Sequence, residues 1–82
     1  MHAGEVETSM MLAEAPELCH MDQAVADYPE YHEEINYRCV PWTEYAKVGI
    51  FGDPTVATAE KGKAYTERMI NHMAEIINRL MD

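Results

Sequence analysis

The chain has 82 residues, of which 48% are hydrophobic, and its formal net charge is -9. This length allows one small domain at most, which would bury only about 60% of the surface of the unfolded chain. No apolar run reaches the roughly 18 residues that a transmembrane helix needs, and the strong acidity argues against binding to nucleic-acid phosphates. The first residues lack the basic and apolar regions of a signal peptide, so we expect a cytoplasmic protein.

The acidic charge is concentrated in the first half of the chain. Residues 1–37 hold nine acids and no Lys or Arg, whereas residues 38–82 hold six acids and six bases. A one-sided acidic segment is usually a solvated surface, but it can also face a cationic substrate, a metal or a basic partner. The charge distribution by itself does not choose between these functions.

Cys19 and Cys39 are the only cysteines of the chain. Their spacing fits neither a CxxC zinc or redox motif nor the disulfide framework of a small secreted domain. We therefore expect two reduced and largely buried thiols, which is how free cysteines usually occur in folded proteins.

The first predicted element is a short helix over residues 5–15. Residues 10–15 are good helix formers, and Thr8 or Ser9 is a plausible N-cap. Pro16 should end the helix, because its ring clashes with the preceding turn and it has no backbone N–H to donate.

The middle of the chain shows no clean periodicity. We expect a short strand over Leu18–Met21 and an irregular, aromatic-rich surface excursion over residues 28–39, a type of segment that often carries binding contacts. A short extended piece is expected near Val48–Phe51. Asp53 and Pro54 should then turn the chain into its last element.

That last element, over residues 56–81, has the clearest pattern in the sequence. It contains no proline, and its only glycine is Gly62. Apolar residues recur at spacings of three and four along one face: Met69, Met73, Ile76 and Leu80, with Ile70, Ile77 and Met81 beside them. The pattern predicts a long amphipathic helix. Its stripe could form a coiled coil, but two heptads are too few to indicate one. We therefore expect the helix to pack against a sheet or a neighbouring helix.

A histidine, a glycine and two acids lie together just before the first helix: His2, Gly4, Glu5 and Glu7. The acids can simply favour the helix dipole beside an incidental histidine. Alternatively, the histidine and the carboxylates can bind zinc or manganese, although their spacing matches no strong ligand motif. A third interpretation is a general acid–base pair of histidine and carboxylate. In this third interpretation Gly4 would let a substrate or a neighbouring backbone approach closely.

Two stretches resemble the C-terminal part of the creatininase (creatinine amidohydrolase) family. Residues 2–12, HAGEVETSMML, are similar to the family segment H-x-G-x-x-E-T-S-x-M-L, and the likeness continues through residues 16–18, PEL. Residues 52–62, GDPTVATAEKG, resemble the family's entry into its last helix, G-x-P-x-x-A-T-x-E-K-G. Together the two motifs extend over nearly the whole chain, and residues 25–45 are the part that they explain least.

The resemblance implies an α/β fold, a three-layer α/β/α domain with a mostly parallel sheet that usually assembles as a homohexamer. Residues 1–82 would form the C-terminal part of that single domain. We expect this part to be mostly helical, with one or two short strands. Some thirty-five weakly structured residues would be unusual in an independent compact domain, which agrees with a piece of a larger unit.

The resemblance also implies a reaction: hydrolysis of cyclic amides or related C–N bonds, or of cyclic ketones, in a small molecule at a two-metal centre of zinc or manganese. His2 matches the histidine that acts as a general acid/base in the family. Glu7 matches the glutamate of E-T-S and would orient or assist that histidine, and Gly4 would lie near the substrate. Glu5 falls on a position where the family varies, so we assign it no role.

The metal ligands of the family belong to earlier segments, a Glu-x-His motif, an aspartate and an N-G-H motif, which this sequence lacks. We therefore assign no metal ligand here and expect the remaining candidates to be surface residues: His20, Asp22, His32, Glu33, Glu34 and His72. The aromatic residue that the family often places just before the histidine is also absent. We do not expect Trp42 to replace it.

The resulting expectation is the last third of a creatininase-type hydrolase that is inactive alone and docks onto the missing N-terminal portion of the same enzyme. Its substrate would be a small molecule, and neither nucleic acid nor membrane is an expected partner. The alternative is a non-enzymatic, small acidic helical module that oligomerises through its C-terminal helix. A cooperative, monodisperse folded chain would favour the module.

Overall fold

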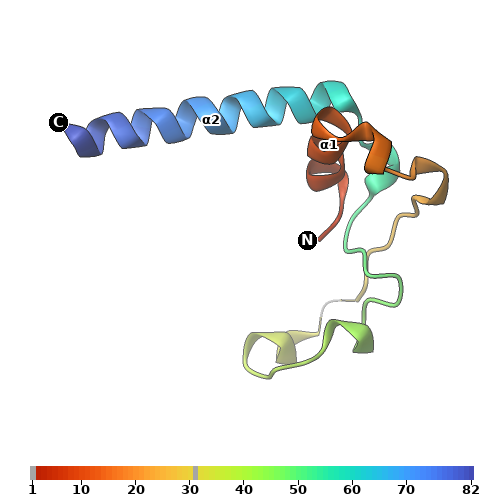
Figure 1. Ribbon diagram of the computed structural model, residues 1–82. Helices are drawn as coiled ribbons and strands as arrows, with labels where there is room; N and C mark the ends of the chain where they lie inside the picture. Colours follow the sequence, from red (N-terminus) through yellow and green to blue (C-terminus); the bar gives the residue numbers. More distant parts are fainter. Residues whose placement is uncertain (1, 31) are drawn as a thin grey trace.

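The computed structural model describes residues 2–30 and 32–82, which contain two α-helices joined by a long, looped connection (Figure 1). The helices are α1 (Glu5–Glu14) and α2 (Ala59–Met81). Five single 3₁₀ turns occupy the connection: η1 (Pro16–Leu18), η2 (Met21–Gln23), η3 (Glu33–Asn36), η4 (Trp42–Glu44) and η5 (Pro54–Val56). None of these helices is long and apolar enough to cross a membrane. Helical structure therefore predominates, as expected.

Helix α1 confirms the predicted short helix but not its predicted cap. Gly4 is the N-cap residue and offers no side-chain hydrogen bond, while Thr8 and Ser9 lie inside the helix. At the other end the N–H of Ala15 donates to the carbonyl of Met11 at 2.8 Å, and a proline follows. The expected cap was wrong because the helix begins at Glu5, so Thr8 and Ser9 already lie within it and cannot precede its first turn.

The two expected strands do not form in the described residues. Leu18–Met21 spans the end of η1 and the start of η2, two turns that close their own backbone hydrogen bonds. In η1 the N–H of Cys19 donates to the carbonyl of Pro16 at 3.1 Å, so local bonds replace those of a sheet. Near Val48–Phe51, pairing is limited to an isolated antiparallel bridge at Phe51.

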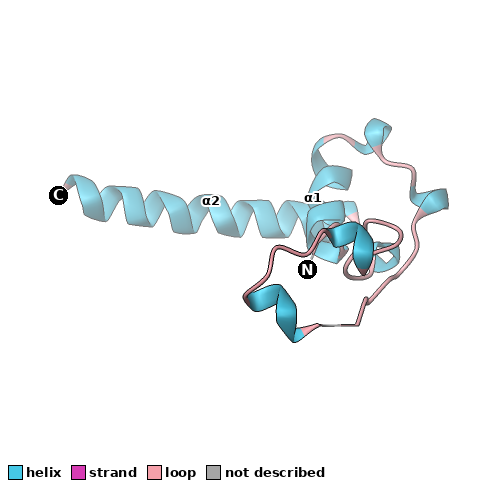
Figure 2. Cartoon of the chain, turned by 90° about the horizontal axis from the view of Figure 1, so that it is seen from below, coloured by secondary structure: helices cyan, strands magenta, loops and turns pink. Residues whose placement is uncertain are grey.

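Helix α2 confirms the long helix but begins three residues later than predicted. The Asp53–Pro54 turn forms as expected, and η5 then occupies the three residues after Asp53. Thr58 is the N-cap, and its hydroxyl accepts a hydrogen bond from the N–H of Lys61 at 3.1 Å. Figure 2 shows that most of α2 extends away from the rest of the molecule.

The two helices meet where a glycine faces a serine. Gly62 of α2 is buried, and a Cβ added to it would lie 2.8 Å from the backbone nitrogen of Met10 and closer still to the carbonyl of Ser9. Ser9 is completely buried, and its hydroxyl accepts a hydrogen bond from the N–H of Thr58 at 3.2 Å. The helices therefore touch backbone to backbone, as small residues allow.

Few apolar side chains are covered in this structure. Among the described residues, Ala46 and Ala57 are the only buried hydrophobic ones. The predicted apolar stripe of α2 is exposed, from 42% at Ile76 to 80% at Leu80. The expectation of two largely buried thiols was also wrong, because Cys19 is half-buried and Cys39 is exposed. A piece of a larger unit would have few buried apolar side chains in this way.

Candidate functional site

The backbone of His2 is fixed by a segment almost fifty residues away. The N–H of His2 donates to the carbonyl of Phe51 at 3.0 Å, and the N–H of Phe51 donates back at 2.8 Å. The next residue, Gly52, makes a second reciprocal pair with Asp27, at 2.7 and 2.9 Å. Three distant segments of the chain thus converge beside the candidate histidine.

The loop between His2 and α1 is held in an unusual conformation. Ala3 has a φ of 51°, in the left-handed region that an L-residue enters at a cost of roughly 1–2 kcal/mol. Its N–H donates to Oε2 of Glu7 at 2.6 Å, and its carbonyl accepts a hydrogen bond from the hydroxyl of Thr8 at 3.4 Å. Side chains of the first turn of α1 therefore stabilise the loop that carries His2.

The hydrogen bond of Glu7 changes how its proposed role is understood. The contact that the structure gives its carboxylate is with the backbone of Ala3, one residue after His2. This contact positions the histidine through the loop. A direct contact between Glu7 and the imidazole stays a prediction, as does the catalytic role of Glu7.

Gly4 lies against another glycine. A Cβ added to Gly4 would lie 3.4 Å from Cα of Gly52, and one added to Gly52 would lie 3.1 Å from Cα of Gly4. Gly52 also has a φ of 151°, which favours glycine. The close approach expected at Gly4 therefore involves a neighbouring backbone, and its place near a substrate stays a prediction.

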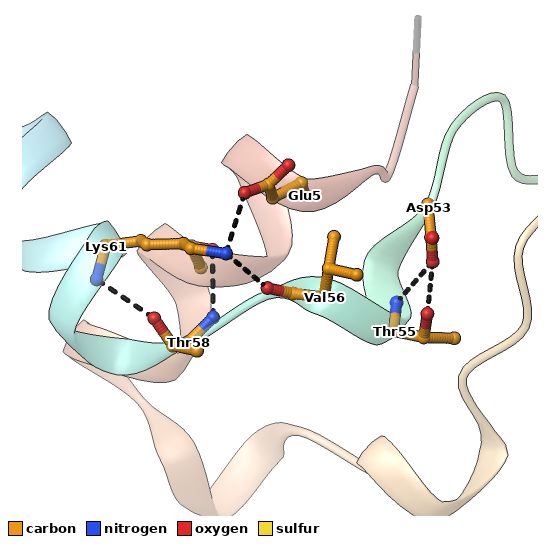
Figure 3. A network of polar contacts seen from close by, with 7 residues as sticks. Glu5, Asp53, Thr55, Val56, Thr58 and Lys61 are labelled. Carbon is orange, nitrogen blue, oxygen red and sulfur yellow. Dashed lines mark hydrogen bonds and ion pairs between the residues drawn. The ribbon is translucent and has the colours of Figure 1, made fainter.

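The second motif stabilises the same region through Lys61 (Figure 3). Its ammonium group lies 3.0 Å from Oε1 of Glu5 and donates to the carbonyl of Val56 at 2.8 Å. Glu5, to which the family resemblance assigns no role, therefore links α1 to α2. Nearby, a carboxylate oxygen of Asp53 accepts hydrogen bonds from both the N–H and the hydroxyl of Thr55, which fixes the turn before α2.

The three candidate site residues line one hollow of about 490 Å³. The hollow lies between the start of α1 and the segment before η5. Its lining consists of His2, Gly4, Glu5, Val6, Glu7, Tyr28, Gly52, Asp53 and Val56. An imidazole and carboxylates that share a concave surface can exchange protons with a bound small molecule.

Trp42 makes the contact that the sequence did not predict. Its ring centroid lies 5.2 Å from that of His2, with the planes 72° apart in an edge-to-face arrangement. It also lies 5.7 Å from Tyr45 and 6.3 Å from Phe51. The only signal for this cluster was the aromatic content of the middle of the chain. The aromatic neighbour of His2 is thus Trp42, which lies forty residues later in the sequence.

The described residues do not form a metal site. No three His, Cys, Asp or Glu side chains within residues 2–30 and 32–82 are close enough to bind one ion together. The side chains expected on the surface are all exposed: His20, Asp22, His32, Glu33, Glu34 and His72. Of these, Glu34 forms an ion pair of 2.6 Å with Arg38.

Comparisons with known proteins agree with the two motifs. The family model for creatininase, described as creatinine amidohydrolase, matches residues 1–77. A 3-dehydro-scyllo-inosose hydrolase of Thermotoga maritima is 30% identical over 103 residues, which cover all of this chain and 32% of that protein. A mycofactocin precursor peptide peptidase of Mycolicibacterium smegmatis is 34% identical over 80 residues, covering 95% of this chain and 32% of that protein.

A solved structure gives the same result for the fold. A mutant creatininase, described as the Zn-Zn type, matches 93% of this chain with a TM-score of 0.78 and 28% sequence identity. The match covers 30% of that protein. The chain therefore spans about a third of the length of the proteins that it resembles.

Proposed function

Because this chain belongs to the creatininase family, we propose that it supplies the acid–base loop of a hydrolase. The substrate would be a small molecule with a cyclic amide, a related C–N bond or a cyclic ketone. One observation carries the proposal: His2, Gly4 and Glu7 line the same hollow. The catalytic candidates are His2 and Glu7, with Gly4 beside the substrate.

His2 would transfer the proton in this reaction. Cleavage of a C–N bond leaves an amine nitrogen that must gain a proton, and imidazole both takes and gives protons near neutral pH. The bridge to Phe51 holds the His2 backbone, and the bond from Ala3 to Glu7 holds the next residue. His2 would therefore meet the leaving nitrogen from a fixed loop, which favours proton transfer.

Divalent metals of the whole enzyme, zinc or manganese, would be bound outside this chain. The similar solved creatininase is described as a Zn-Zn type, but the described residues here gather no group of metal ligands. The donor set of residues 2–30 and 32–82 therefore does not fit a metal centre. Its own contribution is limited to the loop, the hollow and the two helices.

The principal partner would be the remaining portion of the same enzyme. The exposed stripe of α2, including Met69, Met73 and Leu80, is an apolar surface of the kind that marks a contact. Covering this apolar surface would supply a hydrophobic core, which the two buried alanines, Ala46 and Ala57, do not provide. Assembly into a homo-oligomer, a hexamer by family resemblance, would follow once that portion is present.

The test is turnover by the complete enzyme that contains this chain. Replacing His2→Ala should lower kcat by about 10²- to 10⁴-fold, the usual contribution of a general acid or base. His72→Ala, on the exposed part of α2, is the matched control and should leave kcat unchanged. Near-normal turnover by the His2→Ala variant would show that the proposed role is wrong.

The exposed stripe also favours a second candidate, a helical module without enzymatic activity that oligomerises through α2. Size-exclusion chromatography and circular dichroism of the 82-residue chain discriminate between the two. A monodisperse species with cooperative unfolding supports the module. A poorly folded chain that gains structure only with the rest of the enzyme supports the hydrolase.

A further inference from the structure

We propose that Trp42 is the positioning residue of His2 and sets the direction in which the imidazole faces. This inference rests on the proposed function, since it concerns the group assigned there to proton transfer. Trp42 is the only tryptophan of the chain, and its ring meets that of His2 edge to face at 5.2 Å. At this separation and angle, two aromatic rings attract each other.

His2, Phe51 and Trp42 contact one another in a ring of three residues. The backbone of His2 is paired with the backbone of Phe51 through two hydrogen bonds. The Phe51 ring lies 6.3 Å from Trp42, edge to face, and Trp42 contacts the His2 ring. One residue therefore holds the backbone of His2, and a second, itself in contact with the first, holds the ring.

Both constraints are needed to fix a proton-transfer group. Pinning only the backbone leaves the two side-chain torsions of a histidine free to populate several rotamers. An edge-to-face partner lowers the energy of one ring orientation relative to the others. His2 is exposed in this chain, and Trp42 is the residue whose ring the structure places against its imidazole.

Trp42 is well placed for this role because its own backbone is fixed. It begins η4, and its carbonyl accepts hydrogen bonds from the N–H groups of Tyr45, at 3.1 Å, and Ala46, at 2.7 Å. Ala46 is buried with only 4% of its surface exposed, and the Tyr45 ring lies against the indole. The hydrogen bonds of η4 therefore fix the backbone of Trp42, whose side chain contacts His2.

The exposure of Trp42 separates this role from ordinary core packing. Trp42 remains 46% exposed, so its contact with His2 lies at the surface of this chain. Trp42 is also not among the described residues that line the hollow. We therefore assign it a positioning role and no contact with the substrate.

The test is a double-mutant cycle in the complete enzyme. Trp42→Leu should lower kcat by about ten- to a hundredfold while KM changes less than about twofold, because misplacing a catalytic group affects the chemical step. Trp42→Phe, which keeps an aromatic edge, should recover most of the loss. Tyr37→Leu, at an exposed tyrosine (73% exposed) five residues before Trp42, is the matched control and should have no effect.

The cycle then compares the same change without the histidine. In the His2→Ala background, Trp42→Leu should cause no further loss, because a residue that acts only through His2 has nothing left to position. An equal loss in both backgrounds would assign Trp42 a general structural role and overturn the inference. So would an unchanged kcat in the Trp42→Leu variant. Full activity of His2→Ala would instead contradict the proposed function itself.

Nuclear magnetic resonance of the histidine ring protons gives a second measurement that does not depend on turnover. The indole should shift the ring-proton resonances of His2 through its ring current. Trp42→Leu should remove that shift, Trp42→Phe should restore part of it, and Tyr37→Leu should leave it unchanged. Resonances of His2 that do not respond to Trp42→Leu would show that the contact, and with it the inference, is wrong.

Discussion

Gly62 of α2 lies directly on the backbone of Ser9 in α1, with no room for a side chain between them. The Ser9 hydroxyl accepts the N–H of Thr58, the N-cap residue of α2, so the same serine also fixes where that helix begins. This crossing joins the loop of His2 to the long helix. The two backbones are so close at Gly62 that no side chain larger than that of glycine fits there.

Gly62→Ala should therefore destabilise the protein, by about 1–3 kcal/mol or more, because overpacking forces the two backbones apart. Helix propensity alone predicts the opposite sign, a gain of about 1 kcal/mol. Asn71→Ala, on the exposed part of α2, isolates that propensity and should stabilise slightly. Chemical denaturation of the complete enzyme, followed by circular dichroism, measures both, and a Gly62→Ala variant as stable as the parent would contradict the crossing.

Lys61→Met should weaken the contact between the two helices by about 1 kcal/mol, because it removes both the ion pair with Glu5 and the hydrogen bond to Val56. Both charged side chains are partly exposed, so the effect should shrink as salt is added. Lys63→Met, two residues further along the same helix, is the control. Equal effects of the two substitutions at low salt would argue against the contact.

Glu7→Ala and Glu7→Gln should differ in how well the amide of Ala3 is protected from hydrogen exchange. Alanine removes the acceptor of the Ala3 N–H, whereas glutamine retains a side-chain carbonyl that can accept it. We expect fast exchange at Ala3 in the first variant and slower exchange in the second. If glutamine preserves protection but lowers kcat, the carboxylate has a catalytic role beyond the loop. Equal protection in both variants would contradict the hydrogen bond.

Ala3→Val should destabilise the loop by about 1–2 kcal/mol, since a β-branched residue is strongly disfavoured at positive φ. Ala3→Gly should relieve the strain and raise the melting temperature. Ala24→Val is a control in extended backbone, where valine fits readily. A tolerated valine at position 3 would show that the loop does not adopt the left-handed conformation.

The sequence predicted the parts of the fold that depend on neighbouring residues. The spacing of Met69, Met73, Ile76 and Leu80 identified α2, and Pro16 correctly ended α1. The start of α2 was misplaced by three residues because Pro54, which was expected to turn the chain, also begins a 3₁₀ turn. Local signals therefore located the helices well and their ends less well.

The sequence did not predict contacts between distant residues. Nothing near Gly62 indicates that Ser9 will lie against it, and nothing near Trp42 points to a histidine forty positions earlier. The strand expected over Leu18–Met21 failed for a related reason: it has no partner strand among the described residues, so local turns form instead. Resemblance supplied His2 and Glu7, but only the structure connects Glu7 to Ala3.

The bridge between Asp27 and Gly52 brings together the two ends of an excursion that is longer than the one predicted over residues 28–39 and runs over residues 28–51. The entropic cost of closing a flexible loop grows only slowly with its length. Insertions or deletions within this excursion can therefore accumulate during evolution without moving the backbone that pairs with His2. Because Trp42 lies inside it, such length changes would alter which side chain meets the histidine, and with it the direction in which the imidazole faces.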